Sequence, residues 1–120
     1  MTSNDKSIDQ SQLLKGVLDM AVLAVLSAGD GYGYDVVRRL RVAGLSDVAE
    51  ASVYGTLRRL FADGALNSYV VPSEEGPHRK YYGLTDNGRD QLLALSGTWS
   101  SFSGVISTLI DGTAKGGNHD

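Results

Sequence analysis

The sequence predicts a mainly α-helical fold with one small β-hairpin, in the order helix, helix, helix, hairpin, helix. Two observations carry this prediction. Hydrophobic residues recur at intervals of three and four in four segments, and glycine follows each of the first three. Between the third and fourth segments, residues 66–71 and 79–84 have strand composition and flank a Gly-Pro turn. At 120 residues, the chain is expected to form one domain.

The first helix is expected over Leu13–Ala28, where apolar residues surround the axis and only Lys15 and Asp19 are charged. A helix that is apolar on nearly every side is buried on more than one face. We therefore expect its second face to meet a partner chain. Gly29 follows as the stop signal.

A short second helix is predicted over Tyr34–Ala43, followed by a turn and a third helix over Ala51–Asp63. The apolar stripe of the second helix is Tyr34, Val37 and Leu40, with Arg41 beside it. The predicted core face of the third helix is Val53, Leu57, Leu60 and Phe61. Its opposite face is expected to carry Ser52, Gly55, Arg58, Arg59 and Ala62.

The hairpin strands are predicted at Leu66–Val71 and Arg79–Leu84, and Thr85 is a suitable N-cap for a final helix over Asp86–Ile110. That helix carries hydrophobic residues at spacings of 3, 4, 3, 4 and 3, which is a seam of coiled-coil type. The seam residues are Leu92, Leu95, Trp99, Phe102, Ile106 and Leu109. Beside the seam, Ser-Gly pairs at 96–97 and 103–104 repeat at an interval of seven.

Two short helices joined by a turn and followed by a hairpin are the winged helix-turn-helix layout. We expect a disordered tail over 1–11, the winged helix-turn-helix DNA-binding domain over 12–84, a C-terminal dimerisation helix over 85–111 and a disordered tail over 112–120.

The third helix is the predicted recognition helix, and the hairpin tip is the predicted wing. Small and basic side chains suit a helix that enters a major groove, and basic residues at a stiff turn suit phosphates. The candidate DNA-binding residues are Ser52, Tyr54, Gly55, Arg58 and Arg59 of the helix, with His78, Arg79 and Lys80 of the wing. The alternative is that these basic side chains only solvate an exposed surface.

The seam of the final helix has two interpretations. One is close helix packing in a homodimer. Glycine inside a helix costs about 1 kcal/mol relative to alanine, and close packing would explain why two glycines occur there. The other is an effector pocket between subunits, in which Trp99 and Phe102 offer flat faces to a small aromatic or cationic compound.

Composition excludes several classes of function. The chain has no cysteine, and its two histidines, His78 and His119, are far apart, so no metal site or cofactor is expected. No nucleophile elbow or phosphate-binding fingerprint is present, so an enzyme is not expected. The apolar stretch at 20–29 is too short to cross a bilayer, and the N-terminus is polar, which predicts a cytoplasmic protein without a membrane partner.

Bulk charge gives little support to nucleic-acid binding. The net charge is −3, and residues 32–82 hold seven basic and six acidic side chains, a balance of +1. The DNA interpretation therefore depends on where the basic residues fall.

Four segments carry a family resemblance: Tyr-Gly-Tyr-Asp at 32–35, Val-Tyr at 53–54, Leu-Arg-Arg-Leu at 57–60 and, most specific, Gly-Pro-His-Arg-Lys-Tyr-Tyr-Gly-Leu-Thr at 76–85. With these segments, the sequence over about 13–109 resembles the PadR family of transcriptional regulators, specifically its short members. The segment at 76–85 is similar to the wing signature of that family.

The resemblance implies a homodimer that represses transcription from an inverted-repeat operator and is released by a small molecule. It also implies phosphate contacts by Ser52, Tyr54, Arg79 and Lys80, and a pocket tryptophan at Trp99.

The sequence departs from the usual PadR pattern at the start of the recognition helix, where it has Ala49, Ala51 and Gly55. These residues leave a weaker cap and no proline, so the first turn is expected to be less rigid. His78 stands where proline is common, which allows the wing to respond to pH.

The function predicted from the sequence is a sequence-specific, DNA-binding transcriptional repressor released by a small-molecule effector. One alternative is a winged-helix module that binds proteins rather than DNA, which the acidic net charge and Glu74-Glu75 at the wing support. The other is a regulator that senses a nucleotide second messenger, although the final helix supplies only Arg89 and hydroxyl groups for phosphates.

Overall fold

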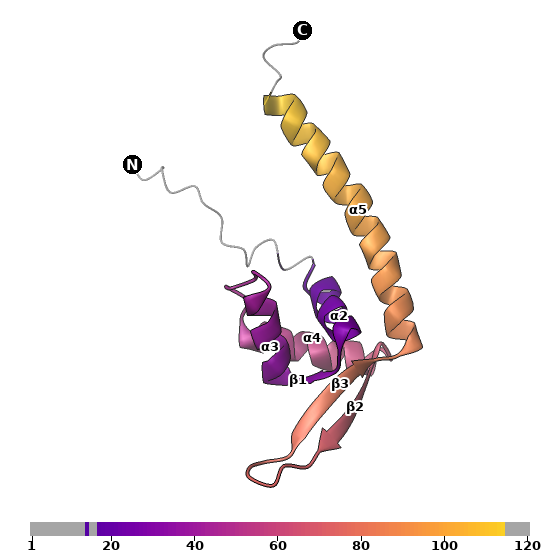
Figure 1. Ribbon diagram of the computed structural model, residues 1–120. Coiled ribbons are helices and arrows are strands. Elements are labelled where there is room, and N and C mark those ends of the chain that lie inside the picture. The colour runs from indigo at the N-terminus through magenta and orange to yellow at the C-terminus, as the bar shows by residue number, and fades with distance from the viewer. Residues whose placement is uncertain (1–13, 15–16, 115–120) are drawn as a thin grey trace, which may run out of the picture.

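The computed structural model describes Leu14 and residues 17–114, so the predicted tail over 1–11 lies outside the described residues. Its elements in chain order are α2 (Leu18–Ala28), β1 (Gly31–Tyr32), α3 (Gly33–Val42), α4 (Glu50–Ala62), β2 (Leu66–Val71), β3 (Arg79–Leu84) and α5 (Asp86–Ala114). The predicted fold class, mainly α with a small β-hairpin, is confirmed (Figure 1).

Helices α2, α3 and α4 enclose the hydrophobic core. The largest fully buried side chains are Leu23, Leu40, Leu57, Leu60, Val22, Val36, Val37 and Val53. Helix α2 contacts α3, α4, α5 and β3 of its own chain. These contacts bury Leu18, Val22, Leu23 and Leu26, and the expected contact of a second face with a partner chain stays a prediction. The helix also starts later than predicted, because Val17 has φ −129° and ψ 4°, outside the helical region.

Two residues predicted to face the core are exposed instead. Phe61 is 43% exposed and Tyr34 is 48% exposed. In α4, the buried face is extended on the other side by Thr56, which is 5% exposed, so Phe61 lies at the edge of the stripe. In α3, the buried face includes Val36, which is fully buried. Tyr34 therefore lies outside that face and is exposed.

The sheet has three antiparallel strands in the order β1-β3-β2. Both hairpin strands have the predicted bounds, with Leu66 opposite Leu84 and Val71 opposite Arg79. Strand β1 was not predicted, because two residues are too short to show any alternation. It pairs Gly31 with Tyr82 and holds the start of α3 against the hairpin.

Helix α5 begins at the predicted cap. The Thr85 hydroxyl oxygen accepts a hydrogen bond from the Gly88 amide at 3.0 Å, and the hydroxyl donates to the Gly64 carbonyl oxygen at 2.7 Å. Gly88 is required there, because a Cβ would lie 3.1 Å from the Ala65 carbonyl carbon and closer still to its oxygen. The helix continues to Ala114, so residues 112–114 of the predicted C-terminal tail are helical.

Beyond its first turns, α5 extends away from the rest of the fold (Figure 1). By length and composition alone, its residues Asp86–Thr113 meet the requirement for a membrane span, with a hydropathy of 1.2. The prediction of no membrane partner rested on the shorter apolar stretch at 20–29. A helix that packs against other helices passes the same test, so this property is weak evidence for a membrane.

Candidate DNA-binding interface

The candidate interface is a hollow of about 460 Å³ where the start of α3, the exposed side of α4 and the wing meet. Three of its lining residues, Arg58, Arg79 and Lys80, are basic. No salt bridge joins any of them to an acidic side chain in the part of the chain that the structure describes. The other lining residues are Tyr32, Gly33, Tyr34, Tyr54 and Tyr82.

Aromatic rings hold the two wing cations in place. The guanidinium carbon of Arg79 lies 4.4 Å from the centroid of the Tyr32 ring. The Lys80 ammonium lies 5.5 Å from the centroid of Phe61 and 5.6 Å from that of Tyr82. Such cation–π contacts position a charge without neutralising it. Both cations therefore remain available to an anionic ligand such as phosphate.

Phe61 contributes to this interface, although its sequence pattern did not indicate it. Its place at i+4 from Leu57 indicated a core residue, whereas its ring lies beneath the wing lysine. The place of Phe61 at the end of the predicted α4 stripe is the only sequence signal that could have indicated this role.

Helix α4 is positioned by contacts that do not include a side-chain cap. Its N-cap residue, Ala49, makes no capping hydrogen bond, as the sequence indicated. The preceding turn is held by Arg41, whose Nη2 donates to the Val48 carbonyl oxygen at 3.0 Å. Gly33 gives α4 a close contact with α3, because a Cβ there would lie 2.9 Å from Cδ1 of Tyr54 and closer still to Cε1.

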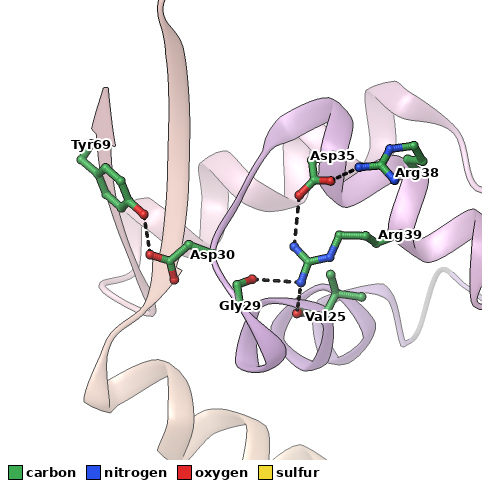
Figure 2. A network of polar contacts seen from close by, with 7 residues as sticks. All are labelled: Val25, Gly29, Asp30, Asp35, Arg38, Arg39 and Tyr69. Atoms are coloured by element: carbon green, nitrogen blue, oxygen red, sulfur yellow. Dashed lines mark hydrogen bonds and ion pairs between the residues drawn. The ribbon is translucent and has the colours of Figure 1, made fainter. Parts of the chain in front are cut away.

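A network of polar contacts fixes the start of α3 against α2 and the wing (Figure 2). Arg39 Nη2 donates to the carbonyl oxygens of Val25 at 2.7 Å and Gly29 at 2.9 Å, which satisfies the C-terminal end of α2. Asp35 accepts from Arg39 at 3.3 Å and also pairs with Arg38.

The same region is tied to β2 by one hydrogen bond. The Tyr69 hydroxyl donates to Asp30 Oδ2 at 2.6 Å, and this bond raises the pKa of the Tyr69 phenol above its ordinary value. Across the sheet, the Tyr69 and Tyr81 rings stack with centroids 5.8 Å apart. Tyr32 meets Tyr81 edge-on at 5.4 Å.

The structure brings together Tyr54, Arg58, Arg79 and Lys80 among the eight predicted DNA-binding residues. Ser52 is exposed near the start of α4, and His78 is exposed in the turn before β3. Gly55 lies on α4 with Nη2 of Arg58 as the nearest atom that an added Cβ would meet, at 3.9 Å.

Arg59 is not part of this hollow. Its guanidinium donates two hydrogen bonds to the Asp19 carboxylate of α2, at 2.8 and 2.7 Å. The hydrogen bond to Asp19 and the negative charge of that carboxylate raise the pKa of Arg59. Arg59 therefore faces α2 and α5, whereas the helical projection had grouped it with Arg58.

A second, larger hollow of about 930 Å³ lies between α2 and α5. It contains four of the six predicted seam residues, Leu95, Trp99, Phe102 and Ile106. Leu92 and Leu95 pack partly against the core, whereas Trp99, Phe102, Ile106 and Leu109 are between 39% and 61% exposed. Most of the seam is thus an apolar surface that the described residues of one chain leave open.

Within residues 17–114 and Leu14, no group of three or more His, Asp or Glu side chains is placed to hold a metal ion.

The fold has three helices and a wing beside the third of them. Between that helix and the wing lies a hollow whose basic side chains pair with no acidic side chain of the described residues. These features define a winged helix-turn-helix protein. Residues 22–94 match the transcriptional regulator PadR-like family, and the chain belongs to that family.

Solved structures of PadR-type regulators resemble most of this chain. A PadR-like transcriptional regulator from Bacillus cereus is 34% identical, with a TM-score of 0.73 over 82% of this chain and 96% of that one. A PadR family regulator from Eggerthella lenta is 30% identical, with a TM-score of 0.75 over 82% of this chain and 86% of the other. Bacillus subtilis PadR, solved in complex with operator DNA, is 25% identical, with a TM-score of 0.60 over 66% of this chain and 46% of that chain.

Proposed function

We propose that this protein is a sequence-specific DNA-binding repressor that acts as a homodimer and is released by a small-molecule effector. The observation that carries the proposal is the convergence of Arg58, Arg79 and Lys80 on one hollow without an acidic partner in the described chain. Unpaired basic groups on the surface of an acidic protein favour an anionic partner.

Duplex DNA fits the arrangement of these groups. A major groove about 12 Å wide admits one helix, which would be α4, with Gly55 allowing its backbone to approach the base edges. Arg58 and Tyr54 would contact phosphates or bases from α4, with Ser52 at its first turn. The wing, with His78, Arg79 and Lys80, would follow the phosphate backbone. The resemblance to a PadR solved with operator DNA supports this mode of binding.

Arg59 does not belong among the proposed phosphate contacts. Its guanidinium is already paired with Asp19 on the side of α4 that faces α2. We therefore assign the electrostatic part of the affinity to Arg58, Arg79 and Lys80.

The dimer is proposed to form through α5. This helix presents a row of exposed large apolar side chains along the part that extends beyond the core, namely Leu93, Trp99, Phe102, Val105, Ile106, Leu109 and Ile110. An apolar surface of this kind is characteristic of an association face. A two-fold dimer would place two α4 helices about 34 Å apart, which matches successive major grooves of an inverted repeat. We also propose a cytoplasmic location, which a DNA-binding role supports.

The proposed effector site is the hollow between α2 and α5. Trp99 and Phe102 supply aromatic surface there, and a ligand would act by favouring one spacing of the two heads over another.

Charge reversal tests the proposal. The triple variant Arg58→Glu, Arg79→Glu, Lys80→Glu is expected to lose duplex binding in fluorescence anisotropy. The matched control, Arg89→Glu, changes an exposed arginine of α5 and is expected to bind normally. If the triple variant keeps its duplex affinity while folded, the protein-interaction module becomes the better interpretation.

A further inference from the structure

The ion pair between Asp19 and Arg59 lies inside the hollow between α2 and α5. Both residues line it together with Met20, Leu95, Trp99 and Phe102. The pair is bidentate, with Nη2 of Arg59 2.7 Å from Oδ1 of Asp19 and Nη1 2.8 Å from Oδ2. These are the only two charged side chains among the described lining residues. The aromatic hollow therefore has one carboxylate and one guanidinium in its wall, joined to each other.

The two partners differ in how easily they can leave the pair. The Arg59 side chain is 53% exposed and the Asp19 side chain 35%. Arg59 has a long side chain that can reach water, and Asp63 lies close enough to interact with its charge. Asp19 has a short side chain in the first turn of α2, where the positive end of the helix dipole favours a carboxylate. A competitor would therefore displace the arginine and leave the carboxylate in place.

This asymmetry decides which charge the hollow accepts. An anionic ligand that pairs with Arg59 must lie beside Asp19, whose short side chain cannot move away. The two negative charges then repel each other at this short distance. A cationic ligand that pairs with Asp19 releases the Arg59 side chain into water at a small free-energy cost. Trp99 and Phe102 add cation–π attraction to such a ligand.

We propose that Asp19 is the counter-ion for a small aromatic cation bound against Trp99, and that binding of this cation displaces Arg59 from Asp19. The proposal deepens the effector role suggested above and rests on it. It assigns Arg59 to effector response rather than to DNA contact.

The position of Arg59 gives the displacement a route to the DNA-binding surface. Arg59 belongs to α4 and follows Arg58, which lines the basic hollow. The Asp19–Arg59 pair joins α4 to α2 from the opposite side of α4. Breaking it removes one of the contacts that fix the orientation of α4. Because binding linkage is reciprocal, a cation that weakens DNA binding must itself bind less tightly to the DNA-bound protein.

The test compares three probes of one shape and different charge: 1-methylquinolinium, quinoline and quinoline-4-carboxylate. Calorimetry gives each affinity, and quenching of Trp99, the single tryptophan, reports whether the probe lies in this hollow. We expect the cation to bind most tightly and the carboxylate most weakly.

Two variants give opposite results if the proposal holds. Asp19→Asn is expected to remove the preference for 1-methylquinolinium over quinoline. Arg59→Gln is expected to tighten binding of the cation about three- to fivefold, because the competing surface ion pair is gone. Arg89→Gln removes an exposed charge elsewhere and is expected to change neither affinity. Circular dichroism establishes that each variant is folded.

Three results would overturn the proposal. These are tighter binding of the carboxylate than of the cation, an unchanged cation affinity in Arg59→Gln, or no binding of any probe to the folded wild-type protein. A failure of the DNA-binding proposal is distinguishable, because the protein would then bind the cation in the predicted way but bind no duplex.

Discussion

Gly33 and Tyr54 are in direct contact, with the Tyr54 ring filling the space that a Cβ at position 33 would occupy. The ring atom Cδ1 would lie 2.9 Å from that Cβ, and Cε1 closer still. This contact sets the distance between the start of α3 and the outward face of α4. Gly33, the glycine of the Tyr-Gly-Tyr segment at 32–34, is thus part of the scaffold of the basic hollow.

Gly33→Ala is expected to displace the Tyr54 ring, to lower the free energy of unfolding by about 1–3 kcal/mol and to weaken duplex binding. Urea unfolding and fluorescence anisotropy measure the two effects. The control is Gly55→Ala, which meets no atom closer than 3.9 Å and gains helix propensity, so stability should rise by about 0.5–1 kcal/mol. Equal stability changes of the same sign in both variants would contradict the role of the Gly33–Tyr54 contact.

Removal of Arg39 tests the network at the end of α2. Arg39→Met leaves the Val25 and Gly29 carbonyl oxygens without their donor, so we expect a loss of about 1–3 kcal/mol in unfolding free energy. Arg38→Met serves as the control, because the Arg38 side chain is 54% exposed and its pair with Asp35 should contribute no more than about 1 kcal/mol. Similar losses in the two variants would show that the carbonyl contacts are unimportant.

The hydrogen bond from Tyr69 to Asp30 predicts a dependence of stability on alkaline pH. The raised pKa means that the folded state holds the phenolic proton after an unfolded tyrosine has released it near pH 10. The stabilisation is therefore fully present below about pH 10 and is lost as the pH rises through the higher folded-state pKa. The melting temperature of the wild type should fall more steeply over this range than that of Tyr69→Phe. Parallel pH profiles would refute this assignment.

The glycines of α5 test the proposed dimer. A Cβ at Gly97 or Gly104 meets nothing within 4 Å in the chain. Alanine at either position should therefore favour the helix by about 1 kcal/mol. If a second α5 packs closely over these positions, the double variant Gly97→Ala, Gly104→Ala must nevertheless have a higher dimer dissociation constant, measured by analytical ultracentrifugation. Gly112→Ala, which also meets nothing within 4 Å but lies outside the seven-residue repeat, is the control. An unchanged or tighter dimer in the double variant would argue against close packing at the repeat.

The elements that the sequence predicts best are those whose signal is local. The bounds of both hairpin strands and the Thr85 cap depend on residues within a few positions, and all three are confirmed. The two-residue strand β1 could not be predicted, because it forms only where β3 already provides a pairing edge.

The candidate site was less predictable because it depends on contacts between distant segments. Arg58 and Arg59 are neighbours in sequence, and a helical projection groups them on one face. Asp19, forty positions away from Arg59, determines that the two arginines serve different surfaces. Phe61 shows the same limit, since its exposure depends on Thr56 extending the buried face and its role depends on Lys80 of the wing.

The most direct test of the central claim is fluorescence anisotropy with labelled duplex from upstream of the protein's own gene, against a scrambled duplex of equal composition. The titration is made at low and at moderate salt. We predict tight binding that prefers the upstream duplex and weakens steeply as salt increases, because phosphate contacts release counterions. Failure of a folded, dimeric protein to bind either duplex at low salt would contradict the claim that the hollow formed by Arg58, Arg79 and Lys80 is a DNA-binding surface.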